Sequence, residues 1–193
     1  MRQAARSRGF TLIELMVVIV IIGILATVAV PQIVERLRER RAAQAASEIA
    51  LMYRTARLRA MGQGFAVLVN YTAANGFQVR EAMPFGTGAG TCTLQLPFSC
   101  TTNNWTAAAN YRVVGGFYPT AYPGVTQTVS VAGAATSTLD MCFTPRGRTF
   151  FRTNSGAALT PITSMVDIAV TRTFTGNTRN VSLLPNGMAR LSL

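Results

Sequence analysis

A single acidic residue, Glu14, lies inside a run of 21 otherwise uncharged and mostly apolar residues at positions 10–30. A helix rises about 1.5 Å per residue, so such a run spans roughly 30 Å, the thickness of the hydrocarbon core of a bilayer. A lone carboxylate in hydrocarbon is costly and seeks a positive partner. The chemistry that Glu14 indicates is therefore ion pairing in apolar surroundings.

Residue sets typical of catalysis or of metal binding are missing from the sequence. Histidine is absent, which removes most acid–base and metal-site chemistry near neutral pH. Beyond residue 60 the acids are Glu81, Asp140 and Asp167, scattered singly, and the Gly-rich stretch 86–90 has no Lys. We expect no enzyme activity, no catalytic residues, no metal and no cofactor.

The three cysteines, Cys92, Cys100 and Cys142, allow three single disulfides, each of which leaves one thiol over. Cys92 and Cys100 lie in the same expected loop, where closing a short ring is geometrically easy. We therefore predict a Cys92–Cys100 disulfide, with Cys142 buried as a small apolar residue on its strand.

Two ordinary explanations of the N-terminus, a cleaved secretory signal and a simple membrane anchor, both leave Glu14 unexplained. Three Arg residues precede the apolar run and four closely follow it. Because flanking charge is present on both sides, the positive-inside rule does not fix the orientation.

The segment at positions 9–15 has the sequence GFTLIEL, behind a short basic leader and ahead of an apolar helix with Pro31. This pattern resembles the N-terminus of type IV pilins and type II secretion pseudopilins. The resemblance implies that residues 1–9 are a prepilin leader peptide. It also implies that a membrane-embedded aspartyl peptidase cuts the Gly9–Phe10 bond and methylates the new terminal Phe10. Glu14 would then pair with the terminal amine of a neighbouring subunit.

The helical pattern extends past the apolar run, because no Gly or Pro occurs from Ile33 to Met61. An apolar stripe at three- and four-residue steps consists of Ala45, Ile49, Met52, Tyr53, Ala56 and Ala60. We divide the helix into a transmembrane and assembly segment, 10–31, and an amphipathic continuation, 32–61. Gly23 and Pro31 are candidate bends. We expect the stripe to pack on the core of the chain's own head.

Residues 62–193 are predicted to form a β-rich globular head with mostly antiparallel pairing. The candidate strands are 65–71, 77–81, 111–115, 126–131, 139–144, 149–152, 166–173, 179–184 and 188–193. The stretch 84–110 has little periodicity and is predicted to be a long surface loop. The fold class is α+β: a long N-terminal helix packed on a C-terminal antiparallel β-sheet head, as in the type IV pilin fold that the resemblance implies.

The C-terminal part of the head gives a second resemblance. The segment 143–148 has the sequence FTPRGR, and the segment 179–182, RNVS, and then Gly187 follow it. These motifs are similar to the GspH/FimT branch of the family, which includes the FimU-type minor pilins. The resemblance implies a minor subunit with a long helix packed on two β-sheets. We place subunit-specific contacts in the inserted region 84–110.

The charge of the chain raises a separate possibility. All 18 basic residues are Arg, the net charge is +11, and residues 61–193 hold eight Arg against three acids. Such a head could bind DNA phosphates, as the FimT relatives used in DNA uptake do with a basic C-terminal segment. The candidate anion patch consists of Arg146, Arg148, Arg179 and Arg190. The simpler explanation is a solvated surface in an Arg-biased composition.

We therefore expect a structural subunit, a minor pilin of a type IV pilus or a pseudopilin of a type II secretion system, within a tip or assembly-priming complex. The expected partners are other pilins and minor pilins, prepilin peptidase, the inner-membrane assembly platform and a candidate tip adhesin. The chain would start in the bacterial inner membrane as a single-pass prepilin with a periplasmic head, and then enter the filament. Two alternatives stay open: a DNA-binding minor pilin of a competence pilus, and the type II secretion minor pseudopilin H.

Overall fold

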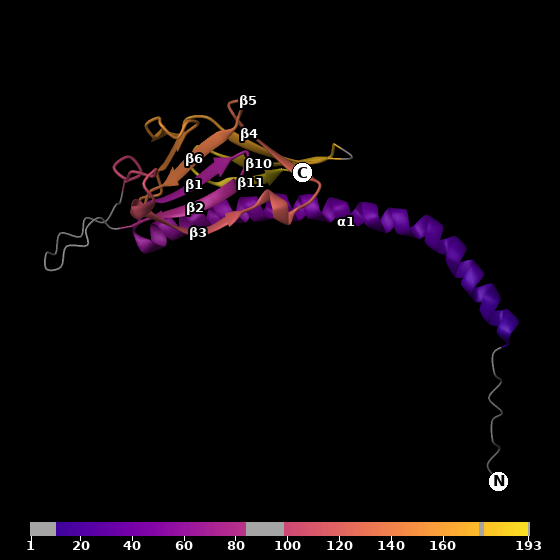
Figure 1. Cartoon of the computed structure of the whole chain (residues 1–193). Coiled ribbons are helices and arrows are strands. Elements are labelled where there is room, and N and C mark those ends of the chain that lie inside the picture. The colour runs from indigo at the N-terminus through magenta and orange to yellow at the C-terminus, as the bar shows by residue number, and fades with distance from the viewer. Residues whose placement is uncertain (1–10, 84–98, 174–175, 193) are drawn as a thin grey trace, which may run out of the picture. The chain divides into compact units, whose positions relative to one another are not determined.

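The computed structural model describes residues 11–83, 99–173 and 176–192, apart from the side chains of Val28, Pro31 and Arg38. The chain divides into two compact units, Met1–Glu39 and Arg40–Leu193. One helix, α1 (Leu12–Gln63), supplies the described part of the first unit and continues into the second. All strands belong to the second unit (Figure 1).

The ends of α1 have identifiable local causes. At its start the hydroxyl of Thr11 accepts a hydrogen bond from the backbone N–H of Glu14 at 3.3 Å, which is an N-cap contact. The helix ends at Gln63, two residues beyond the predicted end, because Gly64 then adopts φ +75° and donates its N–H to the carbonyl of Ala60. Glycine adopts this left-handed conformation without steric cost, so Gly64 terminates the helix.

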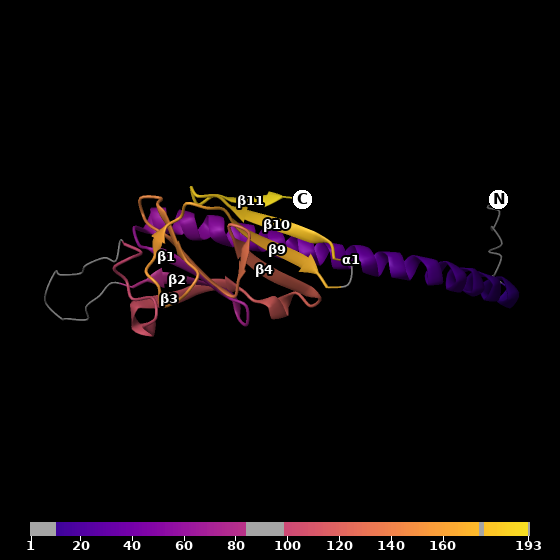
Figure 2. The same cartoon turned by 90° about the horizontal axis from the view of Figure 1, so that it is seen from above.

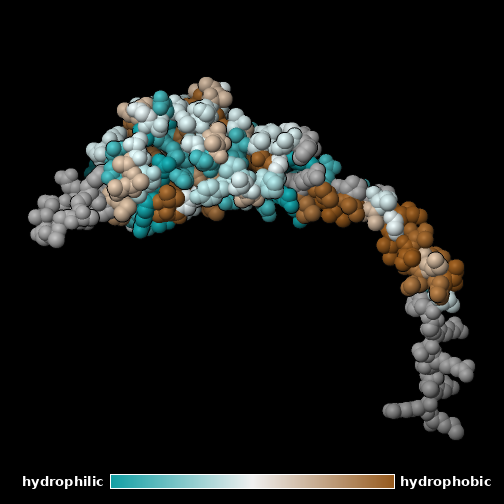
Figure 3. Space-filling model, viewed as in Figure 1, coloured by the Kyte–Doolittle hydropathy of each residue, from teal (hydrophilic) through white to brown (hydrophobic). Residues whose placement is uncertain are grey.

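In the first unit, large apolar side chains are exposed on every face of the helix. Leu12, Ile19 and Leu25 are 77%, 57% and 63% exposed, and hydrophobic residues dominate this part of the surface (Figure 3). Among the described residues, no single straight helix is long and apolar enough to cross a membrane. The two segments Leu12–Thr27 and Gln32–Gln63, which are joined by a bend, meet the length and composition of a span when they are taken together. A helix that is apolar all round needs cover from outside itself.

The second unit contains two antiparallel sheets. The six-stranded sheet has the order β3-β2-β1-β6-β7-β8, made of β1 (Val67–Thr72), β2 (Gly76–Ala82), β3 (Tyr111–Phe117), β6 (Thr138–Phe143), β7 (Thr149–Arg152) and β8 (Thr160–Pro161). The five-stranded sheet has the order β11-β10-β9-β4-β5, made of β4 (Val125–Val131), β5 (Ala134–Thr136), β9 (Val166–Arg172), β10 (Thr178–Leu183) and β11 (Ala189–Ser192). Two short 3₁₀ turns, η1 (Ala108–Asn110) and η2 (Pro119–Ala121), flank β3.

The C-terminal part of α1 and both sheets share one hydrophobic core, with strands of both sheets lying along the helix (Figures 1 and 2). Every member of the predicted stripe is buried except Met52, which packs partly buried against the core. Tyr53 lies at the centre, with its ring edge-on to Phe77 and Phe143. The predicted α+β class and the packing of the helix on its own head are confirmed.

A second, smaller core covers the outer face of the six-stranded sheet. Strand β6 is buried on both faces: Leu139, Met141 and Phe143 join the main core, while Cys142 lies in the second cluster beside Trp105. Trp105 is 2% exposed and donates its indole N–H to the carbonyl of Cys100 at 3.0 Å. Residues 99–110, the described part of the predicted surface loop, contain no strand and are half exposed, as expected of a loop. The buried residues Cys100, Asn103 and Trp105 anchor this loop as a cover over the sheet, which the sequence did not predict.

The predicted Cys92–Cys100 disulfide is wrong. The structure joins Cys100 to Cys142, with a Cα–Cα distance of 5.9 Å, whereas Cys92 lies outside the described residues. The physical reason is the second core: it places Cys100 directly over the outward-facing side chain of β6. Ring size along the chain therefore did not decide the pairing. Tertiary packing brought together two residues 42 positions apart.

Candidate functional site

Glu14 lies in the first turn of α1, next to the exposed side chains of Leu12, Ile13 and Leu15. An acidic side chain is favourable at a helix N-terminus because of the helix dipole. Among the described residues no ion pair involves its carboxylate. A carboxylate surrounded by apolar side chains and without an internal cation is suited to pair with a cation from another molecule.

The cleavage and methylation prediction falls on Gly9 and Phe10, which both lie outside the described residues. The two candidate bends lie within α1. The helix axis bends between Thr27 and Gln32, around Pro31, whereas Gly23 lies inside the first segment of the bent pair. A proline removes one helical hydrogen bond and so gives a physical cause for a bend.

The acids of the head are all bonded within it. Glu81, with a side chain 3% exposed, forms ion pairs with Arg59 and Arg112 at 3.3 and 3.2 Å. Asp140 lies 2.6 Å from the Nε of Arg152, and Asn70 donates to its other oxygen. The hydroxyl of Ser182 donates to Asp167 at 2.5 Å. These groups therefore stabilise the sheets and do not form an acidic site.

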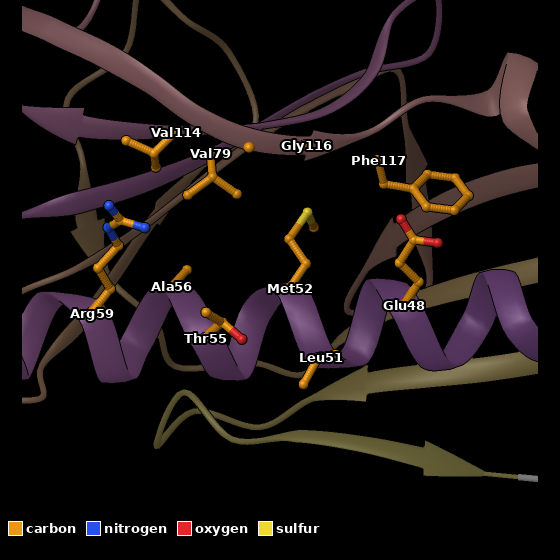
Figure 4. Close-up of a pocket in the computed structure, with 11 residues that line it drawn as sticks. Glu48, Leu51, Met52, Thr55, Ala56, Arg59, Val79, Val114, Gly116 and Phe117 are labelled. Atoms are coloured by element: carbon orange, nitrogen blue, oxygen red, sulfur yellow. The ribbon is translucent and has the colours of Figure 1, made fainter.

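A groove of about 240 Å³ lies between α1 and β3, with Met52, Val79 and Val114 pointing into it (Figure 4). Glu48 lines it at one end and accepts a hydrogen bond from the hydroxyl of Tyr122. Arg59, which also lines it, is paired with Glu81. Both charged side chains already have partners, so this groove offers an apolar surface without a free ionic contact.

The structure divides the candidate anion patch. Arg146 and Arg148 are exposed and line one cavity of about 590 Å³, together with the half-buried ring of Phe150. Arg190 lines another cavity, of about 550 Å³, and Arg179 lines neither of them. Of the four arginines that the sequence suggested as one patch, Arg146 and Arg148 share a cavity, and Arg179 and Arg190 do not line it.

The cavity at Arg190 contains residues that the sequence analysis did not connect. Two arginines of α1, Arg54 and Arg57, line it with Arg190 of β11. Arg54 donates from Nε and Nη2 to the carbonyl of Ala189 at 3.1 and 2.9 Å, which fixes β11 to the helix. The apolar stripe predicts that Arg54 and Arg57 lie off the core, but no sequence signal places the C-terminal strand beside them.

Three tyrosines have raised pKa values. Burial raises the pKa of Tyr53, whose hydroxyl has no hydrogen-bond partner among the described residues. Burial also raises the pKa of Tyr71. The hydrogen bond to Glu48 raises the pKa of Tyr122, because ionisation of the phenol would place two negative charges together. These shifts belong to packing and do not form an acid–base pair.

No group of three or more His, Cys, Asp or Glu residues that could hold a metal occurs in the part of the chain that the structure describes. The one described pair of cysteines is joined as a disulfide.

Comparison with known proteins identifies the N-terminus. Residues 4–30 match the family model described as the prokaryotic N-terminal methylation motif. The match covers the segment that resembles type IV prepilins, including the Gly9–Phe10 bond and Glu14, and confirms that resemblance. No curated protein matches the chain in sequence.

Two solved structures are remotely similar, both of the type IV minor pilin FimU of Pseudomonas aeruginosa. The crystal form in space group P21 has 18% sequence identity and a TM-score of 0.48, over 80% of this chain and 90% of that chain. The form in space group P65 has 18% identity and a TM-score of 0.43, over 78% and 92%. The assignment of the N-terminus rests on the methylation motif and not on these likenesses.

Proposed function

We propose that this chain, which has a prokaryotic N-terminal methylation motif at residues 4–30, is a minor pilin: a structural subunit that enters a type IV pilus or a related pseudopilus near its tip. The observation that supports this most is the position of Glu14, four residues after the expected new terminus at Phe10. The mature chain would therefore carry a terminal amine and a carboxylate four residues apart in sequence, and the carboxylate of one subunit can pair with the amine of a neighbour.

The energetics of assembly follow from the exposed part of α1. Burial of its large apolar side chains between subunits or in lipid supplies most of the cohesion. The pair between Glu14 and a neighbour's terminal amine fixes the register, because an unpaired carboxylate in that environment is costly. A head held on the far part of the same helix is then displayed at the filament surface.

The N-terminus of the mature protein tests the first step. Intact-mass and N-terminal analysis of the chain purified from cell membranes should give a product that begins at Phe10 and has one added methyl group. The Gly9→Val variant should not be cleaved and should keep the mass of the full-length chain. A mature product from Gly9→Val, or a native product that begins elsewhere, would refute the assignment.

The proposed pairing of Glu14 with the terminal amine of a neighbouring subunit gives the second test. Glu14→Ala should insert into the membrane normally and be cleaved, but its amount in sheared filaments should fall by about tenfold, as expected for the loss of a charge-assisted pair. Glu48→Ala, an acid of the same helix with a partner in its own head, is the matched control and should enter filaments normally. Normal incorporation of Glu14→Ala would contradict the pairing.

A second candidate function, DNA binding by a competence pilus subunit, has one observation in its favour. Arg146 and Arg148 share a cavity with Phe150, and arginine with an aromatic ring is a combination that binds single strands. The wider patch does not support it, because Arg179 and Arg190 lie elsewhere. A gel shift with an oligothymidine, weakened by salt and by Arg146→Gln with Arg148→Gln but not by Arg179→Gln, would favour DNA binding.

A further inference from the structure

The cavity between α1 and β11 combines positive charge with exposed apolar side chains, and we name it the arginine groove. Its charged residues are Arg54, Arg57 and Arg190, and its apolar ones include Leu58, Met61 and Met188. With a volume of about 550 Å³ it has the size of a site for a few side chains.

The positive charge of the arginine groove is not balanced by the chain. No acidic residue lines it, and the acids of the head are bonded elsewhere. Among the described residues, the hydrogen-bond acceptor of Arg54 is the backbone carbonyl of Ala189, which is neutral. The Nε of Arg57 is buried and has no hydrogen-bond partner among the described residues. Arg57 as a whole is partly exposed and no acid lines the groove, so its guanidinium group is suited to pair with a carboxylate from outside the chain.

The apolar side chains of the arginine groove favour an anion that also carries an apolar group. Leu58, Met61 and Met188 are 65%, 41% and 52% exposed; the first two lie on α1, and Met188 directly precedes β11. Methionine side chains adapt their shape to an apolar partner. A nucleic-acid backbone gains nothing from these apolar side chains, and no aromatic ring, the common platform for stacked bases, is among the residues that line this cavity.

We propose that the arginine groove binds an acidic and apolar peptide segment of a partner subunit. A carboxylate of the segment pairs with Arg57 and Arg190, and a neighbouring apolar side chain lies on Leu58, Met61 and Met188. The inference rests on the proposed function, because a subunit that assembles with others has such a partner. It adds the location of the contact on the head and the chemistry of the partner.

Binding is measured on the full-length chain purified in a non-ionic detergent. The probe is a fluorescent seven-residue peptide that alternates Asp and Leu. Two comparison peptides have Ser in place of Leu or Lys in place of Asp. Fluorescence anisotropy should show saturable binding of the Asp–Leu peptide and at least about tenfold weaker binding of both comparison peptides, since each lacks one of the two contacts.

Matched variants test where the peptide binds. Arg57→Gln should raise the Kd about tenfold, whereas Arg179→Gln, also half-buried but outside the groove, should change it less than about twofold. Leu58→Ser should raise the Kd about fivefold. Its control is Leu51→Ser, because Leu51 lies on the same helix, is 61% exposed and lies outside this groove. All four positions are at least partly exposed, so these variants should fold.

Three outcomes would overturn the inference: equal binding of the Ser peptide, an unchanged Kd in both Arg57→Gln and Leu58→Ser, or preferred binding of oligothymidine or of anionic vesicles that depends on the arginines but not on Leu58. The peptide assay does not involve cleavage at Gly9 or pairing of Glu14. Normal peptide binding by a chain that is never cleaved or incorporated would therefore reject the proposed function and leave the groove in place. Normal incorporation without peptide binding would reject the groove alone.

Discussion

The two parts of α1 both contain large apolar side chains, but these side chains have different surroundings. Ile19, in the first unit, is 57% exposed, whereas Ile49, in the second, is fully buried. Around Ile49 the polar residues lie outside the buried apolar stripe, while around Ile19 the apolar residues occupy all faces. One part of the helix is therefore covered within the chain, whereas the other exposes its apolar side chains, which under the proposed function are covered by lipid or by other subunits.

The largest expected effect concerns the cross-link that only the second unit has. Cys142→Ser should lower the free energy of unfolding of the head by about 4 kcal/mol, because the Cys100–Cys142 disulfide closes a loop of 42 residues in the unfolded chain. Urea unfolding followed by the fluorescence of Trp105, the single Trp of the chain, reports on the head. The far-UV circular dichroism of a peptide of residues 10–39 gives the helix signal that the first unit contributes on its own. Equal stability of Cys142→Ser and the parent chain would exclude this disulfide.

A matched pair of substitutions tests the comparison directly. Ile49→Ala should lower the free energy of unfolding by about 3 kcal/mol, since it removes a fully buried side chain and leaves a cavity. Ile19→Ala should leave the unfolding of the head unchanged, and any effect should appear in membrane insertion or filament assembly. Urea unfolding of both variants in detergent measures the difference. If both lowered head stability equally, the two parts of the helix would not be separate environments.

The sequence predicted most of the fold because its periodicities are strong. The stripe around Ile49 fixed the buried face of the helix, and each of the nine predicted strands has a counterpart in the structure. Strands β5 and β8 were missed because two or three residues give no readable alternation. The N-terminal motif was found because residue identity and spacing coincide within residues 4–30.

The errors and omissions share a different origin, which is contact between distant segments. The disulfide depends on packing of residues 99–110 over the outer face of β6, and the indole of Trp105 anchors that packing. The arginine groove depends on β11 lying beside α1, where Arg54 bonds Ala189 across 135 positions. Local patterns in a sequence do not encode which faces meet.

The smallest expected effect concerns Tyr53, the largest polar side chain of the buried stripe. Its hydroxyl is buried and has no hydrogen-bond partner among the described residues, while its ring contacts Phe77 and Phe143. Tyr53→Phe keeps the ring and removes the unsatisfied group. The free energy of unfolding at pH 7 should therefore stay the same or rise by about 1 kcal/mol. A clear loss of stability would mean that the hydroxyl has a partner in the folded protein.

The same variant should change the alkaline limit of the head. Burial raises the pKa of Tyr53 above its ordinary value of about 10, so the folded state holds the phenolic proton where the unfolded state releases it. The contribution is complete below pH 10 and is lost as the pH rises above it. In the parent chain the free energy of unfolding should fall above about pH 10, and in Tyr53→Phe it should fall less steeply.

Tyr122→Phe is the control. The hydrogen bond to Glu48 raises the pKa of Tyr122, but this tyrosine lies near the surface, where solvent screens the interaction. Tyr122→Phe should therefore change the alkaline fall in stability less than Tyr53→Phe does. The first unit has no tyrosine within residues 11–39. An alkaline transition that survives Tyr53→Phe unchanged would therefore have its origin in another group of the head, such as Tyr71 in the same core, whose pKa burial also raises.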